Sequence, residues 1–334
     1  MMQKFNSYMK NKLIFSYEIT RACNLRCSYC YALDYLNQKQ THDNEIADLF
    51  IEKIAKFRSD YPDWHFELDI LGGDPLSAPN IFEFLDKILP MGFETWIVTN
   101  LVPTDNNKIV KLKEYLKYTN FGIAATWHDE LSTKKEQQFK DNLLFLKDGI
   151  RDYYSISQDM MYQNVMVSFV LFDGNTKMYD KAKWLVGNDI WYGFTHMYTN
   201  QKRAQKYVDF SDEAKWVFKN AVHHDNKYYI DDKRLTPEEF EEQQLYQISF
   251  KYNTICEPLN FHLDYFGKVE SSCKYRPQIK YDLRTQDIEP KRIFCKGYDC
   301  YCSALGYKEL YGEKNGTSAK LPGSKVFPII INGS

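Results

Sequence analysis

Strand-like and helix-like patterns alternate along residues 12–200 of the chain. Short runs rich in β-branched and aromatic residues predict six strands, at residues 12–19, 65–72, 94–100, 121–127, 164–172 and 192–198. Apolar stripes at helical spacing predict five helices between them, at residues 42–57, from Asn80, at 108–117, from Ser132 and at 177–186. This order implies βαβ units, a parallel sheet and a partial (β/α)6 barrel, because a full eight-unit barrel does not fit in this length.

The pattern changes after residue 200. Residues 210–222 read as a helix, and Thr236–Glu239 forms a capping box with proline at the first helical position. From Cys256 onward the sequence is irregular and rich in turns and cysteines, as expected where a metal centre replaces a hydrophobic core. We therefore predict a barrel domain at 1–200, a helical connector at 201–255 and a small cluster-binding domain at 256–334.

Composition and charge narrow the function classes. The chain has 334 residues, of which 44% are hydrophobic and 26% charged, which excludes global disorder. Its 43 Lys and Arg stand against 45 Asp and Glu, a net charge of −2 that gives no reason to expect a nucleic-acid or anionic-membrane partner. No apolar run approaches the roughly 20 residues that span a bilayer, and the N-terminus lacks a signal-peptide pattern. We expect a cytoplasmic protein.

The eight cysteines fall into two groups with none between residues 31 and 255. The first group is Cys23, Cys27 and Cys30; the second is Cys256, Cys273, Cys295, Cys300 and Cys302. In a reducing compartment such clustering favours metal binding or catalysis over disulfides.

The first group has the spacing C-x3-C-x2-C in a loop after the first predicted strand. Three thiolates on one loop can hold three irons of a [4Fe–4S] cluster and leave the fourth iron open to a ligand. A structural zinc site would need a fourth protein ligand, and the nearest histidine, His42, lies at a predicted helix start. A purely redox cluster and a zinc loop remain alternatives.

With Tyr29 directly before the last cysteine, this segment resembles the radical S-adenosylmethionine (SAM) superfamily, and the resemblance extends over roughly residues 12–200. It implies that Cys23, Cys27 and Cys30 hold a [4Fe–4S] cluster whose open iron binds SAM, with Tyr29 beside the adenine. An electron from a donor such as flavodoxin or ferredoxin would cleave SAM to methionine and a 5′-deoxyadenosyl radical, which abstracts hydrogen from a substrate.

Two strand ends strengthen the resemblance. Gly72-Gly73-Asp74-Pro75 is similar to the family's Gly-Gly-Glu-Pro motif, whose backbone holds the SAM amino group; here Asp74 replaces the glutamate. Thr99-Asn100 is similar to a Thr-Asn-Gly motif, with Leu101 where glycine is usual. These residues are therefore expected to contact SAM.

Further polar residues lie where (β/α) folds place their active sites. His128 and His196 fall at the ends of the fourth and sixth strands, Ser168 lies within the fifth, and Arg203 could reach the SAM carboxylate. They could instead be satisfied polar residues or a solvated charge. Asp129 and Glu130 are interpreted as an acidic pair at a helix start.

The second cysteine group resembles the SPASM and shorter twitch extensions of radical SAM enzymes. Cys256 and Cys273 flank a predicted hairpin turning at Gly267, and the remaining cysteines follow in CKGYDCYC. The resemblance implies an auxiliary [4Fe–4S] cluster held by Cys256, Cys273 and two of the three C-terminal cysteines, Cys295, Cys300 and Cys302. A zinc knuckle built from the same thiols is the alternative.

If three thiols hold the first cluster and four the second, one of the eight remains. Peptide epimerases of this superfamily use a cysteine as hydrogen-atom donor, so the spare thiol among Cys295, Cys300 and Cys302 is a candidate donor. We expect a ribosomally made peptide or protein as substrate, modified by epimerisation, crosslinking or side-chain oxidation. Because little sequence precedes the first strand, that peptide would bind the barrel mouth directly or through a separate partner. The alternatives are a small-molecule dehydrogenase that uses the auxiliary cluster as electron acceptor, and a non-catalytic iron–sulfur or zinc protein.

Overall fold

The description of the fold rests on a computed structural model of the chain. It describes residues 12–30, 32–34, 36, 45–155, 160–171, 177–196, 198–199, 202–203, 211–219, 229–230, 233–234, 254–256, 260–271, 279–289, 292–295, 308–309 and 329–330.

A nine-stranded sheet forms the centre of the described fold, in the order β16-β15-β14-β1-β2-β3-β4-β7-β8. Six of its strands, β1, β2, β3, β4, β7 and β8, pair in parallel and confirm the six strands predicted from the sequence. They are β1 (Lys12–Thr20), β2 (His65–Gly72), β3 (Glu94–Thr99), β4 (Phe121–Thr126), β7 (Val165–Leu171) and β8 (Tyr192–His196). All six therefore end at the same edge of the sheet.

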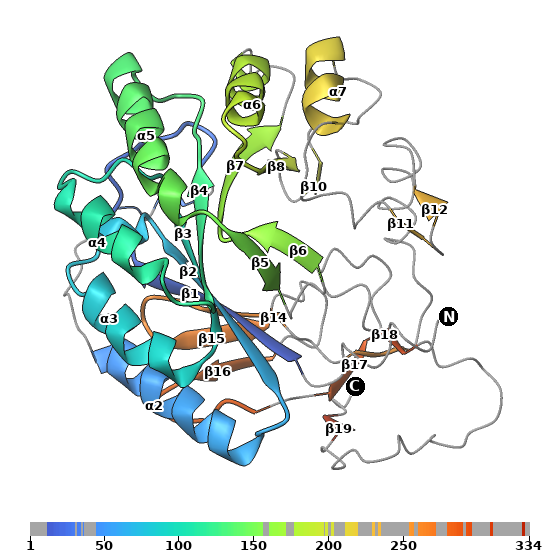
Figure 1. Ribbon diagram of the computed structural model, residues 1–334. Coiled ribbons are helices and arrows are strands. Elements are labelled where there is room, and N and C mark those ends of the chain that lie inside the picture. The colour runs from blue at the N-terminus through green and yellow to red at the C-terminus, as the bar shows by residue number, and fades with distance from the viewer. Residues whose placement is uncertain are drawn as a thin grey trace.

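Five helices connect these strands and cover one face of the sheet (Figure 1). They are α2 (Glu45–Asp60), α3 (Ile81–Ile88), α4 (Asn107–Tyr115), α5 (Thr133–Leu146) and α6 (Met178–Gly187). Three short 3-10 helices lie in the connections between these elements: η1 (Pro75–Ser77), η2 (Leu89–Met91) and η3 (Lys147–Gly149). Ser132 caps α5 as predicted, accepting a hydrogen bond from the Lys135 N–H at 3.4 Å.

The main hydrophobic core lies between the sheet and these helices. Phe15 of β1 is fully buried and packs against Phe66 of β2 and Phe50 of α2, with ring centroids 5.5 Å apart in both pairs. Alternate residues along each strand point into this core, as a period of two requires. The remaining residues of each strand face the opposite, inner side of the curved sheet.

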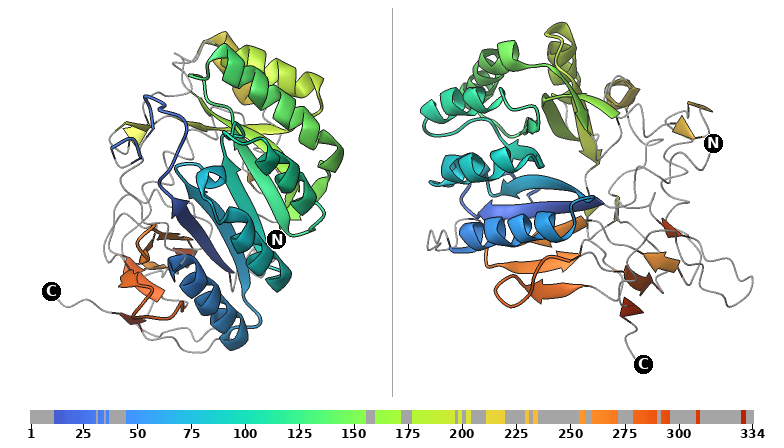
Figure 2. Two further views of the ribbon diagram at one scale, coloured as in Figure 1. Left: turned by 90° about the vertical axis from the view of Figure 1, so that its left-hand side faces the viewer. Right: turned by 60° about the horizontal axis from the view of Figure 1, so that its bottom comes forward.

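Three C-terminal strands extend this sheet past β1. They are β14 (Asn260–Leu263), β15 (Lys268–Ser271) and β16 (Lys280–Asp282), and Figure 2 shows them continuing the sheet beside β1. The hairpin predicted to turn at Gly267 is confirmed, with a left-handed φ of 85° at that glycine. β14 pairs with β1 in parallel, and Phe261 stacks on Phe15 at 5.4 Å, so burial explains the docking.

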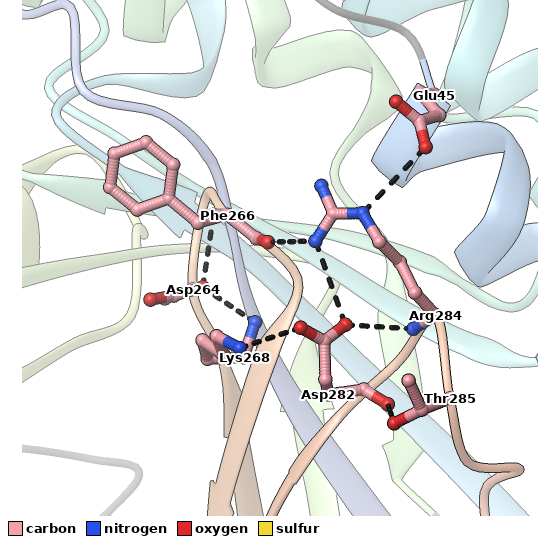
Figure 3. A network of polar contacts seen from close by, with 7 residues as sticks. All are labelled: Glu45, Asp264, Phe266, Lys268, Asp282, Arg284 and Thr285. Carbon is pink, nitrogen blue, oxygen red and sulfur yellow. Dashed lines mark hydrogen bonds and ion pairs between the residues drawn. The ribbon is translucent and has the colours of Figure 1, made fainter.

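A polar network fixes the tip of this hairpin (Figure 3). The Arg284 guanidinium donates to the Phe266 carbonyl at 2.7 Å and lies 3.6 Å from the Glu45 carboxylate of α2. Lys268 pairs with Asp282 at 2.6 Å. The tip in turn meets the end of β1, where the Arg21 guanidinium lies 4.6 Å from the Phe266 ring centroid. The C-terminal hairpin is thus anchored beside the chain segment that leads to Cys23.

Other described elements lie outside the main sheet. The hairpin of β5 (Asp152–Ser155) and β6 (Met160–Gln163) was not predicted; Tyr153 packs edge-on against Trp96 at 5.2 Å. A four-stranded sheet joins β13 (Thr254–Cys256), β17 (Arg292–Cys295), β18 (Lys308–Glu309) and β19 (Ile329–Ile330).

The predicted connector contains three described pieces. They are helix α7 (Asp212–Lys219), the strand pair β9 (Tyr198–Thr199) with β10 (Lys202–Arg203), and the pair β11 (Tyr229–Ile230) with β12 (Lys233–Arg234). The capping box at Thr236–Glu239 lies outside the described residues, and the three domain boundaries stay predictions. Within the described ranges, we find no helix long and apolar enough to cross a membrane.

Candidate functional site

The three N-terminal cysteines lie together in the loop that follows β1, at the edge where the parallel strands end. A turn closes the loop, with the Cys30 N–H donating to the Cys27 carbonyl at 3.0 Å. Cys27 is 6% exposed, and Cys23 and Cys30 are partly exposed. The Cys23 sulfur accepts hydrogen bonds from the Leu25 N–H at 3.4 Å and the Asn100 amide at 3.9 Å. Such donors stabilise a thiolate ligand.

Burial changes the acidity of the loop thiols. Burial raises the pKa of the Cys27 thiol to about 12, and Glu130 and the other two cysteines act in the same direction. Burial likewise raises the pKa of the Cys23 thiol. Metal binding deprotonates such thiols, because the cation supplies the charge that burial otherwise disfavours.

The three thiols do not form a site for a single metal ion. In the described part of the chain, no three His, Cys, Asp or Glu side chains converge closely enough to hold one metal ion. In a [4Fe–4S] cluster each thiolate binds a separate iron. The loop after β1 supplies three such thiols.

Gly72 and Gly73 bring the end of β2 against the chain that leads to Cys23. The Gly73 N–H donates to the Thr20 carbonyl and the Asp74 N–H to the Ala22 carbonyl, both at 2.8 Å. A Cβ at Gly72 would overlap the Thr20 carbonyl oxygen, and one at Gly73 would overlap that of Ala22. Gly72 also has a φ of 142°, which L side chains rarely adopt. This close backbone approach is the physical reason for two glycines here.

Asp74 uses its carboxylate inside the protein. It is 3% exposed and accepts hydrogen bonds from the Leu76 N–H at 2.8 Å, the Thr99 hydroxyl at 3.1 Å and the Asn100 N–H at 2.7 Å. Burial raises the pKa of this carboxyl, and the backbone hydrogen bonds oppose the rise. Asp74 therefore connects the end of β2 to the end of β3. Asp74 also caps the short helix η1, which begins at Pro75.

The β3 end continues that connection into the cysteine loop. The side-chain amide of Asn100 makes two hydrogen bonds. Its NH2 group donates to the Asn24 side chain at 2.9 Å, and its oxygen accepts from the Val102 N–H at 3.0 Å. Leu101 has a left-handed φ of 56° although its side chain is fully buried. A left-handed backbone is costly for a residue other than glycine, and here apolar burial offsets that cost.

The turn after β4, at residues 128–130, is hydrogen-bonded to the cysteine loop. The His128 Nδ1 lies 3.0 Å from the Tyr29 hydroxyl, and the Asp129 N–H donates to that hydroxyl at 3.3 Å. The Glu130 carboxylate accepts from the Ser28 N–H at 2.7 Å and from the Ser28 hydroxyl. Asp129 and Glu130 precede α5 as interpreted, and both also contact the segment between Cys27 and Cys30, Asp129 through its backbone N–H and Glu130 through its carboxylate.

Burial keeps His128 neutral. Burial, and secondarily the Lys181 charge, lower the pKa of His128 to about 4. His128 is thus a neutral imidazole at neutral pH, with Nδ1 3.0 Å from the Tyr29 hydroxyl.

We expect His128 to make stability depend on pH. Between pH 6.5 and 4 the unfolded chain binds a proton at this histidine that the folded chain excludes, so the free energy of unfolding falls as pH falls. At pH 5 the loss is about 2 kcal/mol relative to pH 7. Urea unfolding of the wild type and of His128→Gln at both pH values measures it. Equal pH dependence in the two proteins would contradict the assignment, since their other titrating groups are the same.

The remaining predicted SAM-side residues are placed only in part. Ser168 of β7 pairs with Thr126 of β4, and its carbonyl accepts from the Trp127 N–H at 2.8 Å, so it lies near the functional edge. The backbone of His196 ends β8, and that of Arg203 lies in β10 opposite Tyr198. The side chains of His196 and Arg203 lie outside the described part of the structure.

Two of the five C-terminal cysteines meet on paired strands. β13 and β17 run antiparallel with Cys256 opposite Ile293 and Thr254 opposite Cys295. In this register Cys256 is two positions from Thr254, the residue that pairs with Cys295. Cys273, Cys300 and Cys302 lie outside the described residues.

Three thiols in one loop at the carboxyl edge of a parallel (β/α) sheet form a candidate cluster-binding site. Comparison with known proteins makes this specific: residues 17–161 match the model of the radical SAM superfamily. This segment is therefore similar to radical SAM domains, and that family implies a [4Fe–4S] cluster and SAM as cofactors.

Among solved structures, SuiB of Streptococcus suis bound to S-adenosylmethionine superposes with a TM-score of 0.54 at 12% identity, covering 86% of this chain and 66% of that one. SuiB bound to precursor peptide SuiA gives 0.51 at 14% identity, covering 86% and 65%. At these identities the similarity establishes the fold. An S-adenosylmethionine-dependent nucleotide dehydratase from Pseudoalteromonas ulvae is 30% identical over 102 residues, which cover 27% of this chain and 32% of that relative.

Proposed function

We propose that this protein is a radical SAM enzyme in which Cys23, Cys27 and Cys30 each bind one iron of a [4Fe–4S] cluster. The observation that carries the proposal is the position of all three cysteines in one loop that the Gly72-Gly73 backbone contacts at the sheet edge. The chemistry that this cluster and SAM supply together is reductive cleavage of SAM followed by hydrogen abstraction from the substrate.

The residues of the chain orient these groups. The Gly72-Gly73 backbone approaches closely enough to present peptide groups to the SAM amino group, and Asp74 holds Thr99 and Asn100 at the same edge. Tyr29, which contacts His128 and Asp129, is proposed to flank the adenine. Ser168 and Arg203, on β7 and β10, are proposed as further contacts to SAM. A cytoplasmic flavodoxin or ferredoxin is the proposed electron donor.

A peptide or protein is the proposed substrate. The fold similarity to SuiB, one structure of which is bound to its precursor peptide SuiA, supports this class. The five C-terminal cysteines support it further, because SPASM and twitch extensions occur mainly in peptide-modifying members. Epimerisation, crosslinking and side-chain oxidation are the outcomes compatible with hydrogen abstraction.

The C-terminal cysteines are proposed to hold an auxiliary [4Fe–4S] cluster. The pairing of β13 with β17, which carry Cys256 and Cys295, supports both as ligands. Cys273 and one of Cys300 and Cys302 would complete the set, which leaves the other as the candidate hydrogen-atom donor. β13 leads to β14, which pairs with β1, so this part of the chain connects directly to the strand that precedes Cys23.

Iron counting tests this arrangement. After anaerobic reconstitution, the triple variant Cys23→Ala, Cys27→Ala, Cys30→Ala is expected to retain about four irons and four sulfides per chain. The matched variant Cys256→Ala, Cys295→Ala is expected to keep the N-terminal cluster alone and to lose the auxiliary one. Zinc in place of iron in the triple variant would contradict the auxiliary cluster and reduce the C-terminal segment to a structural metal clip.

A nucleotide is the second candidate substrate, because the 30% identical relative is a nucleotide dehydratase. The two candidates are separated by incubating the reduced, reconstituted wild type with SAM and each of the four ribonucleoside triphosphates. The peptide proposal expects 5′-deoxyadenosine formation to stay at the level seen without nucleotide. A nucleotide-dependent rise together with loss of water from that nucleotide would favour the second candidate.

A further inference from the structure

Lys181 is a buried cation on α6 with an unusual position in its helix. It occupies the apolar stripe together with Met178, Ala182 and Leu185, and it is 3% exposed. Its ammonium group donates to the His128 carbonyl at 3.0 Å and lies 3.3 Å from the Asp129 carboxylate. It also lies 5.5 Å from the centroid of the Trp127 ring. A buried ammonium is costly unless its partners are in place, so these contacts determine where the turn after β4 can lie.

The same turn contacts the cysteine loop through its other side. His128 and Asp129 hold the Tyr29 hydroxyl, and Glu130 holds the Ser28 N–H and hydroxyl. Ser28 and Tyr29 are the two residues between Cys27 and Cys30. The loop segment that carries two of the three thiols is therefore hydrogen-bonded to residues 128–130, and these residues are in turn held by Lys181.

We propose that Lys181 is a positioning residue that presets the Cys27–Cys30 segment for cluster binding, acting through the turn at residues 128–130. The inference rests on the proposed cluster at Cys23, Cys27 and Cys30. A loop already shaped by protein contacts loses little conformational freedom when iron binds, and partners behind metal ligands raise metal retention in this way. Lys181 touches neither the thiols nor the SAM-side motifs among the described contacts, so it acts only through the turn.

A second effect of Lys181 reinforces the first. His128 Nδ1 lies 3.0 Å from the Tyr29 hydroxyl. The Lys181 charge disfavours a second positive charge on His128, so it keeps this contact neutral in addition to holding the backbone of the turn. Glu130 acts in the opposite direction on His128 but is exposed.

The test compares three reconstituted proteins with the wild type. Lys181→Met removes the buried charge at similar volume. Glu130→Ala removes the exposed carboxylate that accepts hydrogen bonds from Ser28, and it leaves the hydrophobic core intact. Lys183→Met is the control, because Lys183 lies on the same helix but is exposed and contacts Tyr179 instead. The rate of iron loss to an excess of chelator under anaerobic conditions is measured for each, with the electron paramagnetic resonance spectrum of the reduced cluster before and after SAM is added.

We expect iron loss about tenfold faster in Lys181→Met and in Glu130→Ala, an altered cluster spectrum in both, and wild-type behaviour in Lys183→Met. Should Lys181→Met only lower the melting temperature, while iron retention and spectrum match the wild type in both test variants, the positioning role would be overturned. A wild type that binds no iron at the N-terminal loop would instead overturn the proposed function. The two failures are therefore distinguishable.

Discussion

Cys27→Ala is expected to abolish 5′-deoxyadenosine formation from SAM under reducing conditions. Cys27 is the most buried of the three loop thiols and is the middle ligand in the motif, so its loss leaves one iron of the cluster without a protein ligand. Alanine fits the space of the thiol and keeps the Cys30 N–H to residue 27 carbonyl hydrogen bond, which uses only backbone atoms. The expected loss is therefore one of chemistry rather than of folding.

The control for this prediction is Leu33→Ala. Leu33 lies just beyond the motif and is 40% exposed, so its truncation should leave both iron content and SAM cleavage near wild-type values. Product is measured chromatographically after anaerobic incubation with dithionite and SAM, and circular dichroism confirms the fold of each variant. Retained 5′-deoxyadenosine formation in Cys27→Ala would refute the cluster assignment.

Local patterns were sufficient to predict the fold up to residue 200. Each of the six parallel strands β1, β2, β3, β4, β7 and β8 is a short β-rich run, and each helix from α2 to α6 has an apolar stripe, so periodicity alone identified them. The pairing of β14 with β1 could not be predicted in this way. It joins residues 14–17 to 260–263, and only the packing of Phe261 on Phe15 in the folded chain makes it favourable. The β5–β6 hairpin was missed for the same reason, since it depends on Tyr153 reaching Trp96.

The residues of the candidate site also fall into two groups, those that a local motif identifies and those that only the fold brings together. The cysteine spacing and the Gly-Gly pair are local motifs, so the sequence identified them directly. The contacts of Tyr29 with His128 and Asp129 span about a hundred positions and are visible only in the fold. Lys181 did leave a signal, because a lysine on the apolar stripe of an amphipathic helix needs a buried partner. The Asp74 carboxylate shows the same limit: its motif was recognised, but its partners Thr99 and Asn100 come from the neighbouring strand.

Gly73→Ala is the second change with a large expected effect, about a hundredfold loss of SAM cleavage. The added Cβ would overlap the Ala22 carbonyl oxygen, a backbone atom that no rotamer change can move. Relief requires the end of β2 to withdraw from the chain that leads to Cys23, which also breaks the hydrogen bonds from Gly73 to Thr20 and from Asp74 to Ala22. A shift of about 1 Å between the glycine backbone and the thiol loop is enough for this loss.

Gly187→Ala provides the matched control for that glycine. A Cβ at Gly187, at the end of α6, meets no atom within 4 Å, so alanine there should keep activity. It should also raise the free energy of unfolding by about 0.5 kcal/mol, because alanine lowers the conformational entropy of the unfolded chain. Rates at several SAM concentrations separate the effects: a misplaced glycine backbone raises the KM for SAM as well as lowering kcat, whereas a general loss of folded protein lowers kcat alone. If Gly73→Ala cleaved SAM within about twofold of the Gly187→Ala rate, the close approach of β2 to the cysteine loop would be a feature of packing and not of SAM binding.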